Sequence, residues 1–245
     1  MSFGDLPDAS PPKPKHPCQT VCQLSTLPLM NLYANHGRTF IPFSLKREAA
    51  SVARCSIAGV PPIGVAPDWV DGNTRYFATL GLEDGVDVSL FFTFDCQSQQ
   101  SPFYFFDGTY KLHDQSSALI QFVVHQQTRG RDTSSALKNE LPALGFVFGE
   151  PNTEPECPIV EALSNLTIYS EHKVGGVPLF SQIEGDVDAA FDLLRNGYVH
   201  LLQLNMPSAA TEDTLVDGTW PFGELVFHIF AKKAGGVFSF RYIWA

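Results

Sequence analysis

The chain lacks the short motifs that most directly assign a chemistry to a sequence. Its 245 residues contain no G-x-S-x-G nucleophile elbow, no H-E-x-x-H zinc motif and no G-x-x-x-x-G-K-[ST] phosphate loop. No stretch approaches the ~18 consecutive apolar residues that a membrane-spanning helix needs. These absences predict a protein that is not an enzyme, has no catalytic residues and has no membrane partner.

Positive charge is also scarce. The chain has 16 Lys and Arg against 26 Asp and Glu, so its formal net charge is −10. Nucleic-acid binding needs a basic surface, and nucleic acid is therefore not expected as a partner. A surface of this charge suits a basic protein partner, although solubility alone is an equally good reason for it.

Cysteine is sparse, and its five occurrences are irregularly spaced, at Cys18, Cys22, Cys55, Cys96 and Cys157. An odd number in a chain of this size predicts reduced thiols and a cytoplasmic location. His16 lies close to the first two cysteines, and Cys55 or His36 could complete a zinc site, but structural zinc normally uses two closely spaced ligand pairs. We therefore expect no metal and no other cofactor.

The first 20 residues contain five prolines and are expected to form a flexible arm. They have no basic segment followed by an apolar run, so they are not expected to act as a secretory signal. The proline-rich and acidic segment 149–158 suggests a boundary, which divides the remaining chain into halves at 21–150 and 151–245.

Aromatic and β-branched segments separated by Gly, Asp, Ser and Gln predict strands. The chain has 20 Phe, an abundance typical of aromatic-rich strands that pack a sheet. The predicted strands span 75–80, 86–94, 102–106, 118–125, 146–148, 198–205, 224–231 and 236–243, with residues 232–235 joining the last two as a hairpin. Hairpin-length connections and few helices predict an α+β fold with mainly antiparallel sheets and a few short helices.

Three short helices are predicted. Ser44 caps a helix from Leu45 to about Cys55, whose buried stripe is Leu45, Ala49, Val52 and Ala53. Pro158 begins a second helix that turns Ile159, Val160 and Leu163 inward. The clearest helix is capped by Asp186 and stopped by Gly197, with Val187, Ala190, Phe191 and Leu194 facing inward.

A Gly-Gly-Val-Pro segment at residues 175–178 is the most distinctive local pattern. Gly175 and Gly176 can adopt positive φ and Pro178 fixes the next φ, so this segment predicts a structural turn. A weaker copy lies at Ala58-Gly59-Val60-Pro61, 117 residues upstream. The two copies suggest loosely related halves, each with a turn followed by strands.

The same segment carries a family resemblance. His172-Lys173-Val174-Gly175-Gly176-Val177-Pro178 with Gln182 resembles an element of the YwqG-like domain of unknown function, and the segments 198–204 and 220–230 are similar to its later strands. The resemblance is good over 170–245 and weak over 55–125, where Ala58 replaces a glycine and Asp68 a proline. It implies an α+β fold of two related halves and no established catalytic residues. It also implies a bacterial setting in which some members act as immunity proteins against secreted toxins, as in type VI secretion.

Acidic side chains are the candidate partner-binding residues. Glu184, Asp186, Asp188 and Asp192 cluster at the clearest helix, and Glu154 and Glu156 form a second group in the segment before it. The like charges at 188 and 192 are four residues apart and repel each other mildly, which a basic partner would relieve. A solvated face with helix caps accounts for the same pattern.

Histidines offer the remaining candidates. His200 and His228 lie in predicted strands and can meet across a sheet, as a buried hydrogen-bonded pair or as part of a hydrolytic site. His172 and Lys173 either hydrogen-bond the glycine turn or serve a function beside it.

The sequence thus predicts a monomeric, cytoplasmic immunity protein without catalytic activity. It would bind a basic cognate toxin, such as a nuclease, and inhibit it by covering its active or substrate-binding surface. Two alternatives remain open: a small-molecule or carbohydrate binder with a Phe-rich groove between the halves, and a hydrolase that uses His172 or His200 with an aspartate.

Overall fold

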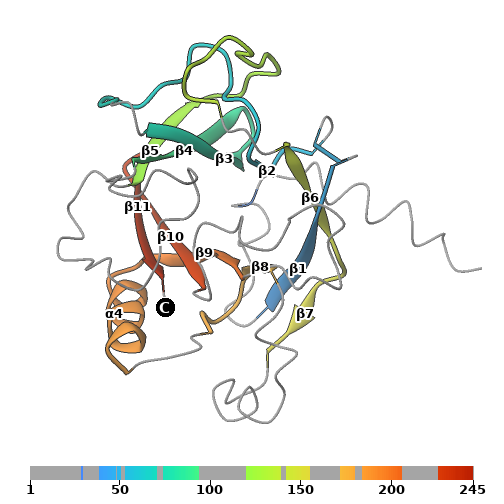
Figure 1. The fold of residues 1–245 in the computed structure, drawn as a ribbon. Coiled ribbons are helices and arrows are strands. Elements are labelled where there is room, and N and C mark those ends of the chain that lie inside the picture. Colours follow the sequence, from blue (N-terminus) through green and yellow to red (C-terminus); the bar gives the residue numbers. More distant parts are fainter. Residues whose placement is uncertain are drawn as a thin grey trace, which may run out of the picture.

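A curved antiparallel sheet forms most of this computed structural model (Figure 1). The structure describes residues 29, 39–47, 49–50, 53–70, 74–93, 120–138, 142–154, 172–179, 184–205 and 226–244. All strand pairs named below are antiparallel, as the hairpin-length connections predict.

Among the described residues, the half up to residue 150 supplies six strands and the half after it supplies five strands and a helix. The strands are β1 (Thr39–Lys46), β2 (Ser56–Ile57), β3 (Thr74–Glu83), β4 (Val86–Thr93), β5 (Ile120–Gln126), β6 (Leu144–Phe148), β7 (Asn152–Thr153), β8 (His172–Gly175), β9 (Val199–Leu204), β10 (Phe227–Ala234) and β11 (Val237–Trp244). The helix is α4 (Glu184–Arg195). None of the helices that can be assessed has the length and apolar character to cross a membrane.

Most predicted strands are confirmed within one to three residues, and the fold is richer in strand than the predicted α+β class. The predicted strand at 102–106 and the helix after Pro158 lie outside the described residues. The hairpin after β10 turns at Gly235 and Gly236, both with positive φ, rather than across 232–235. That geometry suits a two-residue hairpin turn.

The predicted helix at 45–55 is wrong. Ser44 and Leu45 belong to β1, where Phe43 and Leu45 face the core and Ser44 and Lys46 are only half-buried. This alternation has the period of a strand, and pairing with β6 on one side satisfies the backbone. Among the described residues that follow, only isolated turn hydrogen bonds are found, such as Ala53 N–H to the Ala49 carbonyl at 2.8 Å.

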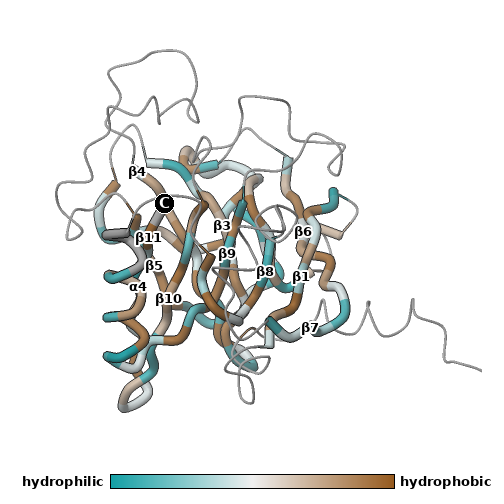
Figure 2. The backbone as a smooth tube through the Cα atoms, turned by 90° about the horizontal axis from the view of Figure 1, so that it is seen from below, coloured by the Kyte–Doolittle hydropathy of each residue, from teal (hydrophilic) through white to brown (hydrophobic). Residues whose placement is uncertain are grey.

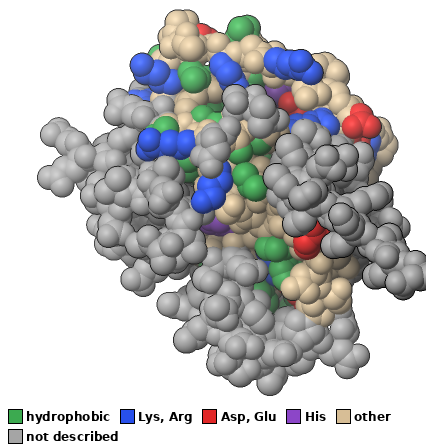
Figure 3. Space-filling view, turned by 90° about the vertical axis from the view of Figure 1, so that its right-hand side faces the viewer, with side chains coloured by type: hydrophobic (Ala, Val, Ile, Leu, Met, Phe, Trp, Pro, Cys, Tyr) green, Lys and Arg blue, Asp and Glu red, His purple; other side chains and the backbone are tan. Residues whose placement is uncertain are grey.

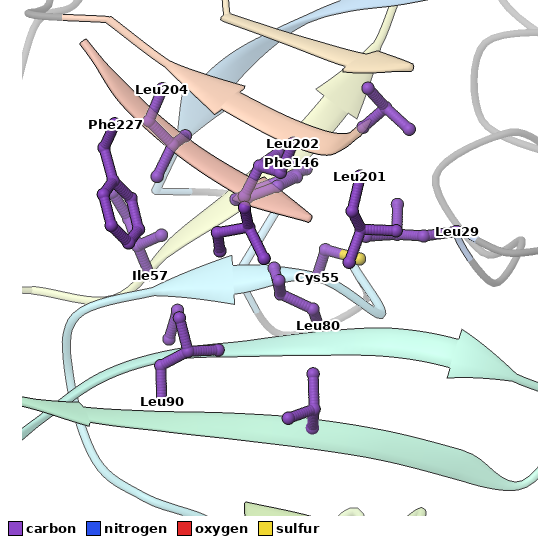
Figure 4. Packing of buried hydrophobic residues seen from close by; sticks show 14 of the residues in the cluster. Leu29, Cys55, Ile57, Leu80, Leu90, Phe146, Leu201, Leu202, Leu204 and Phe227 are labelled. Atoms are coloured by element: carbon purple, nitrogen blue, oxygen red, sulfur yellow. The ribbon is translucent and has the colours of Figure 1, made fainter. Parts of the chain in front are cut away.

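The core lies inside the curve of the sheet. Hydrophobic side chains from both halves converge there, and Figure 4 shows Leu80 and Leu90 facing Leu202 and Phe227 across the interior. Phe122 of the edge strand β5 stacks on Phe240 of the edge strand β11 with ring centroids 4.9 Å apart. The sheet therefore curls until its two edges are bridged by aromatic side chains. Figure 2 shows hydrophobic residues along β9, one of the strands that line the core, as this packing requires.

The strand order has a two-fold character. The order is β11-β10-β9-β8-β1-β6-β2-β3-β4-β5, so exchanging β1 with β6, β2 with β8, and β3–β5 with β9–β11 reproduces it in reverse. Ser44 pairs with Val147 at the centre of the β1–β6 ladder. If one repeat runs from β1 to β5 and the other from β6 to β11, the first strand of each repeat pairs with a strand of the other: β1 pairs with β8, and β6 pairs with β2.

The detailed registers repeat as well. Ser56 of β2 pairs with Thr79, and Lys173 of β8 pairs with Gln203. The ladder of β3 with β4 and the ladder of β9 with β10 each contain a bulge, and the extra residue lies at equivalent positions, Phe77 in β3 and Leu201 in β9. A repeated bulge of this kind shifts the following side chains in the same way in both halves.

The two Val-Pro turns also have the same backbone form. Ala58 and Gly59 have φ of 58° and 77°, and Gly175 and Gly176 have φ of 80° and 69°. The repeat places β6 at the start of the second half, so the division between repeats falls between β5 and β6. The predicted boundary at residue 150 lies after β6, and one sheet and one core cross it.

Candidate functional site

Helix α4 holds four of the six predicted partner-binding acids. Asp188 and Asp192 are exposed, and Asp192 accepts a hydrogen bond from Arg195 at 2.7 Å. The helix begins at Glu184, so Asp186 lies within its first turn and is not the N-cap that we predicted. The side chains of Glu184 and Asp186 lie outside the described part of the chain.

The buried face of α4 differs by one position from the prediction. Ala190 packs with Phe230 and Ile243, joined by Leu193 and Leu194, whereas Phe191 is 38% exposed. Gly197 ends the helix as predicted, with φ of 80°. Its N–H donates to the Leu194 carbonyl and the next N–H to the Leu193 carbonyl, a Schellman motif. The outer side of α4 therefore presents an aromatic ring together with the carboxylates of Asp188 and Asp192.

Glu154 is not a surface acid, and this part of the prediction is wrong. Its carboxylate is buried beneath the glycine turn, where it pairs with the equally buried Lys173 and accepts the N–H of Val177. A carboxylate in this position is held by partners within its own chain, so it cannot contact another protein. Glu156 lies outside the described residues.

The predicted turn at Gly175, Gly176 and Pro178 is confirmed. Lys173 Nζ donates to the Val177 carbonyl at 2.6 Å and lies 5.3 Å from the ring centre of Phe40. A Cβ on Gly176 would lie 2.7 Å from Glu154 Oε2, so this position requires glycine for space as well as for its positive φ. Lys173 and Glu154 together hold both the N–H and the carbonyl of Val177.

His200 and His228 form the buried pair that the sequence suggests. His200 Nε2 lies 3.2 Å from His228 Nδ1, and His200 Nδ1 lies 3.2 Å from the Gly175 carbonyl oxygen and 3.3 Å from that of Gly176. Two carbonyls facing Nδ1 require a proton there, so in the neutral ring Nε2 accepts the N–H of His228. The pair is therefore bonded to the same turn that Lys173 holds.

Burial keeps both rings neutral. It lowers the pKa of His200 to about 3, with the Lys173 charge acting in the same direction. Burial also lowers the pKa of His228 well below its usual value, assisted by His200 and Lys173. Histidines sealed in this way cannot exchange protons with a substrate, which removes the basis for a hydrolase at His200.

His172 lies on the opposite face of β8. Its ring stacks on Phe43, with centroids 5.3 Å apart, and Nδ1 accepts the N–H of Asn205 at 3.1 Å. The ring is 4% exposed, so it is a structural member of the core rather than a residue that functions at a loop. Of the predicted pair at the turn, only Lys173 bonds to the turn itself.

A second polar cluster lies at the equivalent place in the first half. Tyr76 and Thr79 are joined through their hydroxyls at 2.8 Å, Thr79 and Ser89 at 2.9 Å, and Ser89 Oγ lies 2.9 Å from His125 Nε2. Arg131 donates to the Tyr76 hydroxyl and to the Val60 carbonyl at 3.4 Å. Arg131 thus donates to the Val60 carbonyl of the upstream Val-Pro turn, which is equivalent to the Val177 carbonyl that accepts from Lys173 in the second half.

The sequence analysis did not identify this cluster, which includes a serine, a histidine and an aspartate on neighbouring strands. Asp87 lies opposite His125 in the β4–β5 ladder. However, Ser89 is 0% exposed, Asp87 pairs with Arg54 at 3.2 Å, and His125 Nδ1 faces the Gln126 carbonyl at 2.8 Å. Ser89 is therefore inaccessible as a nucleophile, and the histidine is not oriented by the aspartate as a catalytic triad requires.

The loop before β3 carries a second concentration of exposed apolar side chains. Ile63 is 60% exposed, and Trp69 and Val70 are each 48% exposed. The side-chain amide of Gln121 accepts the Trp69 N–H at 3.2 Å and donates to its carbonyl at 2.6 Å. Two hydrogen bonds to one backbone unit hold the indole in place at the edge strand β5. The sequence indicated only a turn here.

Charge is distributed unevenly along the chain. The described residues contain 12 Lys and Arg and 11 Asp and Glu, so the negative charge of the chain resides in the remaining segments. On the face in Figure 3, Lys and Arg side chains gather toward the upper edge and few Asp or Glu are visible between them. The framework itself is thus nearly neutral, unlike the acidic surface that composition suggests.

Within the residues that the structure describes, no group of three or more His, Cys, Asp or Glu is placed to hold a metal ion. The zinc candidates other than Cys55 lie outside those residues, and Cys55 is buried beside Gly81, whose N–H it accepts at 3.4 Å. Searches against family models, curated proteins and solved structures find no match to the chain. The likeness to the YwqG-like family therefore stays a prediction.

Proposed function

We propose that this chain is a monomeric, cytoplasmic binding protein of the YwqG-like type that inhibits a cognate bacterial toxin without catalytic activity of its own. The observation that carries the proposal is the outer side of α4, where Phe191, which is 38% exposed, lies on the same exposed side of the helix as the carboxylates of Asp188 and Asp192. An aromatic anchor flanked by charges is typical of the residues that dominate protein interfaces.

The site geometry supports binding over catalysis. The histidines in the described part of the chain are buried or are engaged on both ring nitrogens, as given above for His200, His228 and His125. The Phe side chains that a ligand groove would need are packed against one another in the core. Exposed chemistry in the described residues is therefore that of a surface for another macromolecule.

Charge defines the kind of partner that this face suits. Two carboxylates beside an aromatic ring favour a basic surface, and the negative charge of the remaining segments would steer such a partner toward the protein. A nuclease presents a basic surface of this kind because it binds phosphates. Covering that surface over roughly 1,600 Å² would exclude its substrate.

The experiment is a binding titration with the toxin encoded beside this gene, combined with an assay of toxin activity. Inhibition in parallel with binding supports the proposal, whereas no binding, or binding that leaves the toxin active, contradicts it. Asp188→Lys should slow association by about ten-fold at low salt, since charges at an interface act mainly on the association rate. Phe191→Ala should weaken binding by more than about 1 kcal/mol.

Glu150→Lys is the matched control, because Glu150 is an exposed acid remote in sequence from α4. It makes the same change in net charge as Asp188→Lys. Equal effects of the two variants would show that only overall charge matters and that α4 is not the binding surface.

A further inference from the structure

The two halves differ in one chemically important way at equivalent positions. By strand register, Tyr76 of β3 corresponds to His200 of β9, and Ser89 of β4 corresponds to His228 of β10. Hydroxyl side chains in the first half are thus replaced by imidazoles in the second. Burial raises the pKa of Tyr76 above its usual value, so neither of the two hydroxyls that stand in place of the imidazoles titrates near neutral pH.

The hydrogen bonds of the histidine pair depend on its protonation. In the neutral pair, His228 Nδ1–H donates to His200 Nε2, and His200 Nδ1–H donates to the carbonyls of Gly175 and Gly176. A proton added to His200 Nε2 would face the N–H of His228 across 3.2 Å, and two donors cannot bond to each other. In the closed arrangement a proton at His200 Nε2 would require His228 to change its tautomer, and the other unprotonated ring nitrogen, His228 Nε2, is buried, where a positive charge is disfavoured.

The surroundings also oppose a positive charge. The charge of Lys173 of β8 acts on both rings, and the carboxylate of Glu154 beside it is already bonded to Lys173 and to the N–H of Val177. Gln203 of β9 and Phe40 of β1 are uncharged. Arg241 of β11 lies in the same row as His200, separated from it by Phe230. A protonated pair would add charge to a buried site that already holds a cation.

We propose that His200 and His228 form a proton-operated latch on the turn at residues 175–179. The neutral pair holds the turn closed, and proton uptake opens the turn while the rest of the sheet stays folded. This is a regulatory property beyond the proposed binding function, and it does not depend on the identity of any partner. Two amides report on the latch, because Val177 N–H donates to Glu154 and Leu179 N–H donates to Gln203 at 3.2 Å.

The direction of the pH effect follows from the lowered pKa values. A histidine in an opened turn titrates near its ordinary value of 6.5, and in the closed turn His200 titrates at about 3. Closing is therefore fully favoured above pH 6.5 and loses its advantage as the pH falls from 6.5 toward 3. In that window the opening constant should rise about ten-fold per pH unit for each proton taken up, or about a hundred-fold for both rings.

Amide hydrogen exchange on the full chain between pH 7.5 and 5, corrected for intrinsic rates, tests the latch. Val177 and Leu179 should lose protection below pH 6.5 with the slope given above. Ala58 is the internal control, since its N–H donates to the Phe77 carbonyl at 2.7 Å at the equivalent turn without histidines. Parallel loss at Ala58 would show global unfolding and overturn the latch, as would unchanged protection at Val177 and Leu179.

His228→Gln keeps a side-chain donor and removes one titrating group, so the slope should fall to at most ten-fold per pH unit. His125→Gln is the matched control, because His125 lies on a strand of the first half, and it should leave the slope unchanged. An unchanged slope in His228→Gln would overturn the proposal. If that variant does not fold, the nitrogen chemical shifts of the two imidazole rings in the folded wild-type protein provide the test. Both rings should be neutral at pH 5, and titration of either ring near pH 6.5 in the folded protein would refute the latch.

Discussion

Replacing Glu154 by Gln removes one of the two charges buried beneath the glycine turn while preserving the shape of the side chain. The variant removes the carboxylate that pairs with Lys173 and leaves its ammonium buried, 1% exposed, where it donates to the Val177 carbonyl at 2.6 Å. Breaking a buried ion pair from one side costs about 3–5 kcal/mol, mainly because the other charge stays desolvated. We expect a loss of this size in the free energy of unfolding.

The double variant Glu154→Gln, Lys173→Met isolates the interaction. It removes both charges, and Gln can still accept the N–H of Val177. Its free energy of unfolding should lie within about 1 kcal/mol of the wild type, because replacing a whole buried pair is often nearly neutral. The resulting coupling energy should be at least about 2 kcal/mol.

Urea unfolding at pH 7.5 is the appropriate assay, since the histidine pair is neutral at that pH in the folded and unfolded states alike. The m-value must stay constant for the comparison to hold. Single variants that each lose less than about 1 kcal/mol and combine additively would refute the reasoning, because the pair would then not clamp the turn.

Three further predictions concern local features. Gly176→Ala should lower the free energy of unfolding in urea by more than about 2 kcal/mol, because the new Cβ would be strained at positive φ and would lie 2.7 Å from a carboxylate oxygen. In Gly235→Ala the Cβ meets no atom within 4 Å, so that variant should lose only the energy of backbone strain, and equal losses in the two variants would contradict this prediction. Burial raises the pKa of Cys55 to about 12, so it should resist alkylation at pH 8 until the protein is denatured, as site-resolved mass spectrometry can check. Lys233→Met should lower the free energy of unfolding by less than about 1 kcal/mol, and this loss should vanish in about 1 M salt, because the ion pair of Lys233 with Glu83 is partly exposed and is screened by salt. A loss that does not depend on salt would contradict this prediction.

Sequence patterns predicted the local elements well where composition was distinctive. Runs rich in aromatic and β-branched residues, bounded by turn residues, predicted the strands β3, β4 and β11. The same reasoning failed at Leu45, where a few apolar residues fit both the helical and the strand period. Pairing with β6 decided between them, and pairing partners cannot be read from a short segment.

Composition was a poorer guide to the surface. The net charge of −10 suggested that Glu154 was exposed, but a carboxylate in an acidic segment can be buried when a cation and an N–H reach it. Likewise, the exposed positions of Trp69 and Phe191 depend on what packs around them, and neither was distinguishable from a core aromatic in the sequence.

The sequence by itself determined the strands β3 to β6 and β9 to β11, the stop of α4 at Gly197 and the two Val-Pro turns, because these depend on backbone preferences and on patterns within a few residues. Only the tertiary structure decided that the halves exchange their first strands, that Lys173 meets Glu154, and that His200 meets His228. Those contacts join residues 19 or more positions apart, and they form only when the curled sheet brings neighbouring strands into one register.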